Sequence, residues 1–346
     1  MKALFVGLGG IGQRHLRILK ELHPRVELLA VRKRGRSFEI GDDLVPDESV
    51  DIEKKYRIKS FTSIHDALKF DPDFAIVANP TSQHTETATQ LVKNKIPVLM
   101  EKPISDTLKG VKNLAELSVQ NKSPLMVGYM MRFHPCALLL KEYLDRNALG
   151  RIFSVIVTVN SFMPDWHRYE NYNEFYAGRK DLGGGVVLTE IHELDLINWF
   201  FGSPSRIGAV GGTLSGLGLD VEDTVSVLMH QPQGNSFFPV TVNMSFVQKT
   251  PLRQFLVLGE YGRLEWDIVA NALKFDDFEH DKHETHNFKD FERNDMFREQ
   301  MKHFLDCVKN SKRPLTALEK VLSGHMTALS IKKSLQEKIF LPIESI

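Results

Sequence analysis

Residues 1–22 read MKALFVGLGGIGQRHLRILKEL, and this stretch decides the fold of the first half of the chain. Residues 3–6 form a short apolar run of the strand type, and from Ile11 onward apolar residues recur at helical spacing. Between them lies the pattern G-x-G-x-x-G. In a strand–turn–helix unit its first glycine allows the tight turn, its second lets the backbone approach a pyrophosphate, and its third lets the helix pack closely on the strand.

The start of such a helix favours a bound anion, because its first N–H groups are unpaired and the helix dipole is positive there. We therefore expect this turn to bind the pyrophosphate of a dinucleotide. The alternative is a structural glycine turn that holds no ligand. The residues expected to contact the cofactor here are Gly7, Gly9, Gly10, Ile11 and Gly12.

The chain has 346 residues, which is enough for about two domains. Lys plus Arg and Asp plus Glu both number 44, so no net field favours nucleic acid or an anionic membrane surface. The two cysteines, Cys136 and Cys307, are far apart in the sequence, which gives little support to a disulfide or a zinc site. No apolar segment approaches the ~18 residues that cross a bilayer. We expect a cytoplasmic protein with neither a nucleic-acid nor a membrane partner.

Strand-like and helical segments alternate over residues 1–125, as a parallel βαβ sheet requires, and we predict a dinucleotide-binding Rossmann domain there. Further strands are expected near residues 26–31, 74–78, 98–100 and 125–127, and helices near 64–70, 86–94 and 105–120. Ligands bind at the carboxyl ends of such strands. Position therefore selects the residues that follow two of the strands as cofactor contacts: Asn79, Pro80, Thr81 and His84, then Glu101 and Lys102.

Arg32 and Lys33 follow the second predicted strand, at the place where an NAD-binding site usually carries an acidic residue for the ribose hydroxyl. A guanidinium there can grip a 2′-phosphate through charge-assisted hydrogen bonds. We favour NADP over NAD, since the carboxylate is missing and the cation is present. The alternative is a solvated basic loop.

The second half, residues 126–346, is predicted to be an α/β domain with a large, mainly antiparallel open sheet. Strands are expected near residues 152–159, 207–211, 224–229, 240–246, 254–258, 263–266 and 272–275. Helices are expected over 186–201, 291–309 and 318–338, and the last two are candidates to pack back on the first domain. The histidines at 280, 283 and 286 lie in a polar segment without periodicity, so we expect a solvated loop and no metal site there.

The predicted helix over residues 186–201 is apolar on all sides and should be buried, so its polar residues need partners. Thr189, His192 and Asp195 are spaced i, i+3, i+6 on one flank, whereas Glu190 points away from His192. A buried helical histidine is by default a hydrogen-bonded core residue. The glycine-rich loop before it and the cofactor domain elsewhere in the chain favour a functional role.

Together these residues resemble the Gfo/Idh/MocA family of NAD(P)-dependent oxidoreductases over essentially the whole chain. The resemblance is carried by the motifs GLGGIG at 7–12, NPTSQH at 79–84, EKP at 101–103, GYMMRFHP at 128–135 and GGGVVLTEIHELD at 183–195. It implies an enzyme acting on a sugar, nucleotide-sugar or cyclitol at one carbinol carbon, and a homodimer or homotetramer formed through the open sheet. The GGG…HE-x-D variant also resembles members associated with bacterial surface-sugar biosynthesis.

By this resemblance Lys102 is the lysine beside the nicotinamide and His192 the acid/base histidine. Either side chain could move the proton that accompanies hydride transfer, and Lys102 could also stabilise the oxygen. A plain salt bridge to Glu101 is the alternative for Lys102. Thr189 stands where many relatives carry an aspartate, so the partner of His192 is open, and we name Asp195 as the substitute.

Substrate contacts are expected from Lys102, Thr189 and His192 and from residues elsewhere in the second half, namely Arg132, His134, Trp166, Arg168 and Tyr169. Packing at an interface explains the aromatic residues about as well. The leading hypothesis is an NADP(H)-linked oxidoreductase of a carbohydrate-like alcohol or ketone. The rival is a catalytically silent dinucleotide-binding regulator on the same fold, for which Thr189 is the one supporting mark.

Overall fold

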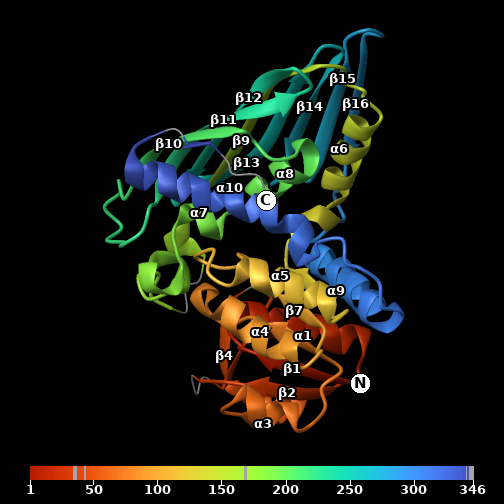
Figure 1. Cartoon of the computed structure of the whole chain (residues 1–346), viewed down its shortest axis with the longest axis vertical. Coiled ribbons are helices and arrows are strands. Elements are labelled where there is room, and N and C mark those ends of the chain that lie inside the picture. The colour runs from red at the N-terminus through yellow and green to blue at the C-terminus, as the bar shows by residue number, and fades with distance from the viewer. Residues whose placement is uncertain (34–36, 43, 167–169, 340, 343–346) are drawn as a thin grey trace.

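The computed structural model describes residues 1–33, 37–42, 44–166, 170–339 and 341–342, and each half of the chain forms its own sheet (Figure 1). The N-terminal sheet is parallel and the C-terminal sheet is mainly antiparallel, which confirms the fold class predicted from the sequence. Helices lie between the two sheets and around the first one (Figure 1).

The first sheet has six strands in the described part of the chain, and all neighbouring pairs are parallel. In spatial order they are β5 (Lys59–Phe61), β2 (Glu27–Val31), β1 (Lys2–Val6), β6 (Phe74–Val77), β7 (Val98–Met100) and β8 (Leu125–Val127). The helices of this half are α1 (Gly10–Leu22), α2 (Ile52–Tyr56), α3 (Ile64–Leu68), α4 (His84–Lys93) and α5 (Val111–Gln120). The side chains of β6, β7 and β8 are buried because helices cover both faces of a parallel sheet.

Several features of this half differ from the expectation, among them β5 and α2, which periodicity did not indicate. The helix predicted over residues 105–120 begins only at Val111, because Ser105 Oγ accepts from the Thr107 N–H and offers the backbone a turn instead of a helix. A small antiparallel hairpin that periodicity did not indicate, β3 (Phe38–Ile40) and β4 (Pro46–Asp51), lies between β2 and α2.

The second sheet has nine strands among the described residues, and only β9 and β12 pair in parallel. In spatial order they are β16 (Lys282–Asn287), β15 (Ala272–Asp277), β14 (Gly262–Asp267), β13 (Val247–Gly259), β9 (Ile152–Phe162), β12 (Ser236–Ser245), β11 (Thr224–Gln233), β10 (Arg206–Gly212) and β17 (Leu341–Pro342). The remaining helices are α6 (Pro135–Asp145), α7 (Val186–Thr189), α8 (His192–Phe201), α9 (Arg293–Asn310) and α10 (Leu318–Glu337).

The expected loop around residues 280–286 is wrong, because most of it forms the edge strand β16. Cross-strand polar pairs replace the missing apolar alternation: His283 bonds Asp276 of β15 at 2.8 Å, and Tyr143 of α6 donates to Glu284 at 2.6 Å. Within the described residues no group of His, Cys, Asp and Glu side chains has the arrangement of a metal site.

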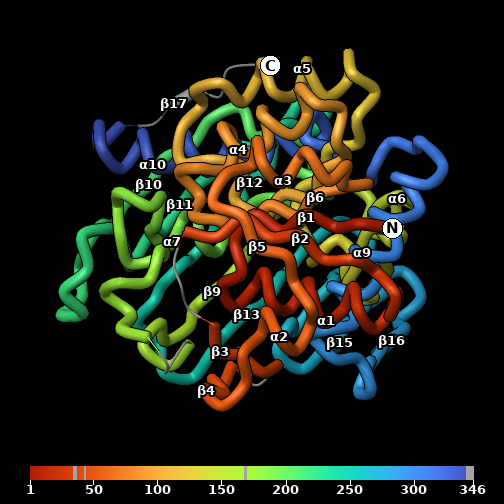
Figure 2. Tube along the Cα trace, turned by 90° about the horizontal axis from the view of Figure 1, so that it is seen from below, coloured from red at the N-terminus to blue at the C-terminus, as the bar shows by residue number. Residues whose placement is uncertain are grey.

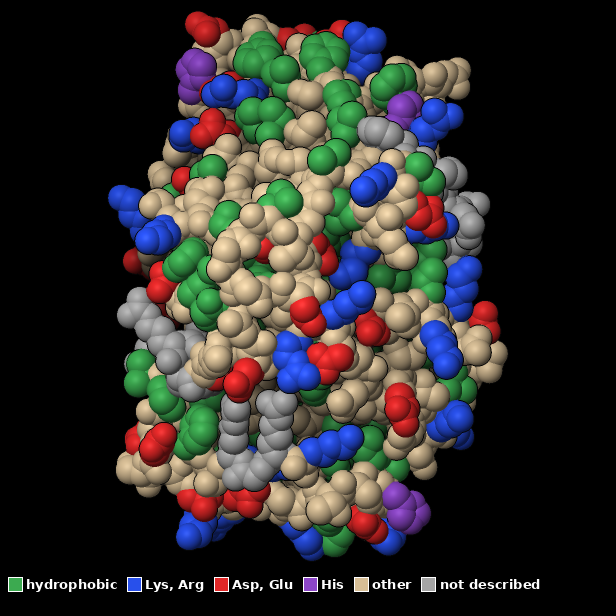
Figure 3. Space-filling model, turned by 90° about the vertical axis from the view of Figure 1, so that its left-hand side faces the viewer, with side chains coloured by type: hydrophobic (Ala, Val, Ile, Leu, Met, Phe, Trp, Pro, Cys, Tyr) green, Lys and Arg blue, Asp and Glu red, His purple; other side chains and the backbone are tan. Residues whose placement is uncertain are grey.

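One face of the second sheet packs against α8 and α10, while its other face is bare (Figure 1). On β11 the residues Val225, Val227 and Met229 point inward and are buried, whereas Leu228 points outward and is 46% exposed. The register places Leu228 opposite Thr241, then Ile156, then Leu256 in one row across four strands of the bare face. Hydrophobic side chains lie among uncharged ones over the upper part of the face in Figure 3.

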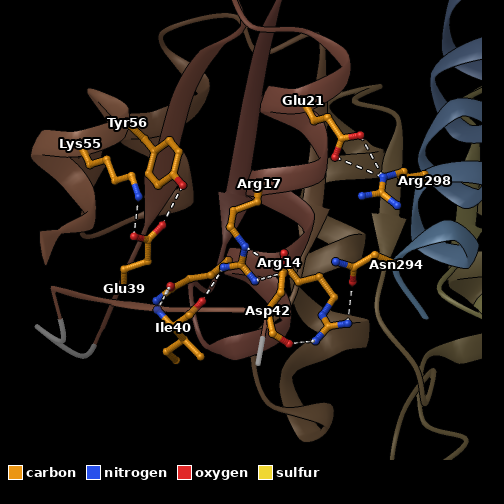
Figure 4. Close-up of polar contacts among 11 residues, drawn as sticks. Arg14, Arg17, Glu21, Glu39, Ile40, Asp42, Lys55, Tyr56, Asn294 and Arg298 are labelled. Carbon is orange, nitrogen blue, oxygen red and sulfur yellow. Dashed lines mark hydrogen bonds and ion pairs between the residues drawn. The ribbon is translucent and has the colours of Figure 1, made fainter. Parts of the chain in front are cut away.

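The C-terminal helices return to the first domain. α9 lies beside α1 (Figure 2), where Arg14 donates to Asn294 at 2.8 Å and Arg298 donates to Glu21 at 2.9 Å (Figure 4). Ahead of α10, Ala317 forms a bridge to Met126 on the edge strand β8, which itself runs to Val127. No helix in the described ranges has the length and apolar character needed to cross a membrane.

Candidate functional site

The glycine turn between β1 and α1 has the geometry that pyrophosphate binding needs. Gly7 adopts φ +97°, and a Cβ there would lie 2.5 Å from the Ala78 carbonyl oxygen. A Cβ on Gly12 would lie 2.5 Å from the Gly7 carbonyl oxygen, so both positions exclude a side chain. Above Gly9, in contrast, a Cβ would meet no atom within 4 Å. α1 begins at Gly10 and Ile11 without a side-chain cap or an acidic residue in its first turn, which leaves its N–H groups available to an anion.

Two loops at the carboxyl ends of β6 and β7 lie next to this turn and are tied together by His84. Its Nδ1 lies 2.7 Å from the Pro103 carbonyl oxygen, and its Nε2 lies 2.8 Å from the Asn79 carbonyl oxygen. Burial lowers the pKa of this imidazole, which is 1% exposed. His84 was predicted as a cofactor contact, but the structure places it behind Pro80 and Thr81 as a support for both loops.

Glu101 is bound from behind by His15 of α1, whose Nε2 lies 2.6 Å from Oε1 of Glu101. Burial alone would raise the pKa of Glu101, but the hydrogen bond and charge of His15, together with Lys102, hold it below its usual value. Within the described residues Lys102 makes no ion pair with Glu101, so the plain salt bridge considered for Lys102 is wrong. Its Nζ instead donates to the Thr189 carbonyl oxygen at 2.6 Å, across the boundary between the two halves.

Thr189 and His192 lie at a break in what was predicted as one helix. α7 ends at Thr189, α8 begins at His192, and Glu190 between them has φ −95° and ψ 37°. Thr189 Oγ1 and both ring nitrogens of His192 are buried and have no hydrogen-bond partner among the described residues. The His192 ring packs edge-on against Tyr129, with centroids 6.1 Å apart.

The positive charge of Lys102 affects the pKa of His192. Burial lowers the pKa of His192 well below its usual value, and the positive charges of Lys102 and Arg253 lower it further. The pKa of Lys102 is lowered as well, because its ammonium is poorly solvated, although Glu190 and Glu101 oppose that shift. The structure therefore brings a lysine from the first half and a neutral imidazole from the second half to one place.

The glycine loop before α7 contacts the side chains of Glu222 and Lys332. Gly185 adopts φ +106°, and a Cβ there would lie 2.2 Å from Glu222 Oε1. Lys332 of α10 donates to Glu222 at 3.1 Å and to the Gly184 carbonyl oxygen at 3.3 Å. These contacts fix where α7 begins, and α7 in turn carries the Thr189 carbonyl that accepts from Lys102.

The expectation that Asp195 orients His192 is wrong. Asp195 accepts two hydrogen bonds from Arg132, at 2.8 Å from Nε and 2.7 Å from Nη2, and both side chains are buried. Burial raises the pKa of Asp195, against the opposing effect of Arg132. A buried guanidinium needs a carboxylate, and α8 presents Asp195 to it. For the same reason Arg132, which was predicted to contact substrate, is not available to do so.

His134, which was predicted as a substrate contact, makes two hydrogen bonds within the chain. Its Nδ1 accepts from the Cys136 N–H at 3.1 Å and so caps α6, and its Nε2 lies 3.0 Å from Asn271 Oδ1. Burial lowers the pKa of this ring to about 4. Trp166 is half-buried and packs edge-on against Phe246, while Arg168 and Tyr169 lie outside the described residues.

Arg32 lies at the end of β2, as expected, but it forms an ion pair with Glu53 of α2. Glu53 also accepts from Ser60 Oγ at 2.7 Å. The end of β2 itself carries no acidic residue, but Glu53 of α2 lies against it. The spacing along the chain did not reveal this contact. Lys33 is exposed next to this pair.

Three charged residues near Lys102 were missed by the sequence reasoning: Glu190, Arg253 and Arg293. Arg253 of β13 donates from Nε to Glu193 at 2.8 Å, and its Nη2 lies 3.6 Å from Glu190 Oε2. Arg293, the first residue of α9, is exposed and makes neither hydrogen bond nor ion pair with any described residue. The available signal was the acidic pair inside an apolar helix, since buried carboxylates require cationic partners.

Arg293 shares a hollow of about 270 Å³ with Arg14, and its remaining lining is Asp42, Leu44, Glu292 and Asn294. The face of the molecule in Figure 3 carries charged side chains of both signs across its middle. The site as a whole thus combines an anion-binding turn, a lysine, a neutral histidine and an unpaired guanidinium.

Comparisons with known proteins match both halves of the chain. Residues 1–129 match the model of the oxidoreductase family with an NAD-binding Rossmann fold, GFO_IDH_MocA, and residues 137–265 match the GFO/IDH/MocA C-terminal domain. The rhizopine catabolism protein MocA of Rhizobium meliloti is 25% identical over 235 residues, which are 67% of this chain and 68% of that protein. Inositol 2-dehydrogenase of Salmonella typhimurium is 25% identical over 278 residues, 79% of this chain and 75% of the relative.

A similar solved structure is that of the WlbA dehydrogenase from Bordetella pertussis in complex with NADH and UDP-GlcNAcA. It superposes with a TM-score of 0.80 at 18% identity and covers 100% of this chain and 99% of that one. At this identity the likeness shows the fold and leaves the substrate of the present chain open.

Proposed function

This chain belongs to the GFO/IDH/MocA family of oxidoreductases with an NAD-binding Rossmann fold, and we propose that it transfers hydride between a nicotinamide and a carbinol or ketone carbon of a sugar, nucleotide-sugar or cyclitol. The family and the nicotinamide-dependent dehydrogenase predicted from the sequence are thereby confirmed. The observation that supports the proposed reaction is the meeting of Lys102 with the α7–α8 break, three residues before His192.

The residues present fit the cofactor. The space above Gly9 accepts a pyrophosphate, and the uncapped first turn of α1 supplies N–H donors. Asn79 Oδ1, which is buried without a partner, offers an acceptor next to the loops that follow β6 and β7. When bound, the nicotinamide supplies or accepts the hydride.

The chain's own side chains handle the proton. Lys102 holds the substrate oxygen electrostatically or exchanges a proton with it, since its lowered pKa makes the ammonium a better acid. His192 is neutral at physiological pH, and its ring nitrogen that carries no hydrogen accepts a proton from a hydroxyl. His192 is 3% exposed, and Lys102 is half-buried.

For the substrate we favour an acidic sugar or a nucleotide-sugar over a neutral cyclitol, as in surface-sugar biosynthesis in bacteria. Arg293 has no ion-pair partner among the described residues, and it borders the hollow that it shares with Arg14. Guanidinium groups bind carboxylates and phosphates through paired hydrogen bonds. A neutral substrate would leave the charge of Arg293 without a use.

NADP remains the proposed cofactor in preference to NAD, with Arg32 and Lys33 as contacts for the 2′-phosphate. The phosphate has to compete with Glu53 for Arg32, so we expect a modest preference. Glu53→Gln should increase the affinity for NADPH relative to that for NADH, and Arg32→Ala should decrease it. Fluorescence titration of each variant with NADPH and with NADH gives both dissociation constants.

We further propose a homodimer or homotetramer built on the bare face of the second sheet, where Ile156 and Leu228 are exposed in one cross-strand row. Exposed apolar rows of this kind are typical of interfaces. Ile156→Lys should shift the mass measured by sedimentation toward the monomer. An unchanged mass would argue against this interface.

The deciding experiment for the proposed function is reduced-nicotinamide absorbance with NAD or NADP and a panel of sugars, uronic acids and nucleotide-sugars. Turnover that depends on Lys102 and His192 supports the enzyme. Tight cofactor binding with no turnover on any member of the panel would favour the rival hypothesis of a silent regulator.

A further inference from the structure

Arg14 and Arg293 come from opposite ends of the chain and line the same hollow of about 270 Å³. Arg14 lies on α1 of the first domain, and Arg293 is the first residue of α9, which returns to that domain. Arg14 is 5% exposed, whereas Arg293 is exposed. Two guanidinium groups therefore face one space at the contact between α1 and α9.

Neither guanidinium forms an ion pair with a described residue. Arg14 donates to the side-chain oxygen of Asn294 at 2.8 Å and to the carbonyl oxygen of Asp42 at 3.4 Å, and both acceptors are neutral (Figure 4). Arg293 makes no hydrogen bond with the described part of the chain. Burial lowers the pKa of Arg14 to about 10, and the positive charge of Arg293 contributes to this shift. A buried cation without a counter-charge is costly, so the pair favours an anion between them.

The two carboxylates that line the hollow are bound elsewhere. Asp42 Oδ1 accepts from Arg17 Nη2 at 2.6 Å and from Arg17 Nε at 3.1 Å (Figure 4). The side chain of Glu292 accepts from the Asp295 N–H in the capping box of α9. Both acidic groups thus have partners of their own, and the two arginines of the hollow have none.

We propose that this hollow is an anion-binding subsite, in which Arg14 and Arg293 together hold a phosphate or carboxylate group. Guanidinium groups suit either anion, because they form paired, charge-assisted hydrogen bonds with its oxygen atoms. An anion bound there contacts α1 and α9 at once, and so links the Rossmann domain to the C-terminal helix. The inference rests on the proposed function only for which ligand carries the anionic group.

The position of Arg14 limits the source of that group to two ligands. Arg14 follows Gly10 by four residues, so it lies on the same face of α1, about 6 Å along the helix from the proposed pyrophosphate site. The next residue, His15, lies 2.6 Å from Glu101, which precedes Lys102. The group therefore belongs either to the dinucleotide or to a substrate that extends from Lys102.

The test is a titration of the full-length protein with inorganic phosphate, followed by phosphorus NMR line broadening at constant ionic strength set with sodium chloride. Arg293→Gln should weaken phosphate binding by about tenfold or more, because it removes charged hydrogen-bond donors. Arg14→Lys keeps the charge but loses the paired donors, and should weaken binding by about threefold or more. Lys302→Gln removes the same charge from the exposed side of α9 and should leave the affinity within about twofold. Circular dichroism verifies that each variant is folded.

A second titration, in the presence of a saturating amount of whichever reduced cofactor binds more tightly, separates the two sources. If the cofactor abolishes the Arg293-dependent binding of phosphate, the dinucleotide supplies the anionic group. If phosphate binds as well as before, the group belongs to a substrate, and turnover of anionic substrates should then depend on Arg293. Either result supports the subsite.

Equal phosphate affinity in the parent and in folded Arg293→Gln would overturn the inference, and so would the absence of line broadening in the parent. Binding that is lost in Gly9→Ala but kept in Arg293→Gln would also overturn it, since the ion would then lie at the glycine turn. If phosphate binds as expected but no sugar or nucleotide-sugar is turned over, the subsite stands and the proposed function fails.

Discussion

The glycine turn and the α7–α8 break beside Lys102 are built from different chemical groups. At the glycine turn, backbone N–H groups and the absence of side chains make the binding surface, and its glycines pack against one another within a short stretch of chain. At the α7–α8 break, side-chain charges from four elements meet around Lys102. The turn is a local structure, whereas the break is a long-range one.

This difference shows where each half is vulnerable. A backbone site depends on space, so it fails when a Cβ is added. A site of buried charges depends on pairing, so it fails when one partner is removed and the other is left buried without its counter-charge. Variants in the two regions should therefore separate cofactor binding from chemistry and from stability.

The largest effect is expected at Lys102 and His192, the two residues proposed to move the proton. Lys102→Met and His192→Asn should each lower turnover by about 10²–10⁴-fold, the usual contribution of a general acid–base group. The dissociation constant of the reduced cofactor should change little, because the backbone of the glycine turn provides most of its binding. Stopped-flow hydride transfer and fluorescence titration measure the two quantities separately. Parallel losses in turnover and in cofactor binding would break the division between the halves.

The next effect concerns stability. Asp195→Asn should lower the free energy of unfolding by about 3–5 kcal/mol, because it leaves the Arg132 guanidinium buried without its carboxylate. The double variant Arg132→Met with Asp195→Leu should recover much of the loss, since it removes both charges. Urea unfolding measures both. If Asp195→Asn were as stable as the parent, the pair would not be the buried contact described above.

A smaller effect follows from the buried neutral histidines. His134 and His325 both have a pKa lowered by burial from 6.5 to about 4. In the unfolded chain these histidines are protonated below about pH 6.5, whereas in the folded protein they are protonated only below about pH 4. The free energy of unfolding therefore falls as the pH falls from about 6.5 to about 4. Each histidine contributes up to about 3 kcal/mol of this loss.

His134→Asn keeps an acceptor for the start of α6 and removes the titration. Its free energy of unfolding should therefore depend less steeply on pH between 7 and 5 than that of the parent. The exposed His280 provides the control, and His280→Asn should leave the slope unaltered. A parent-like slope in His134→Asn would contradict the assignment.

The smallest effect sharpens the comparison at the glycine turn. Gly9→Ala should leave stability within about 0.5 kcal/mol, because the position is open and has an ordinary backbone conformation, yet it should weaken cofactor binding by about tenfold or more. Gly12→Ala should destabilise the protein by about 1–3 kcal/mol through its contact with the Gly7 carbonyl. Thermal unfolding and cofactor titration compare the two. Equal destabilisation by both would refute the assigned roles.

Much of the first half was predictable because its signals are local. The apolar runs of β1, β2, β6 and β7 and the glycine spacing are properties of consecutive residues. The edge strand β16 was missed because its pairing depends on polar contacts with β15 and α6. Such contacts leave no alternation of apolar and polar residues in the sequence. The break after Thr189 was missed because the sequence on either side is apolar and helical, whereas the backbone angles of Glu190 end α7 there.

The sequence by itself determined the Rossmann half, the glycine turn and the family, since each depends on residue type and short spacing, and it named Lys102 and His192 as the residues proposed for proton transfer. Only the tertiary structure decided the partners: Arg132 with Asp195, Arg32 with Glu53, and Lys102 with the Thr189 carbonyl oxygen. Charge pairs form between whichever groups the fold buries together, and the cost of leaving one of them unpaired selects the partner. That selection depends on distances in space, which spacing along the chain does not contain.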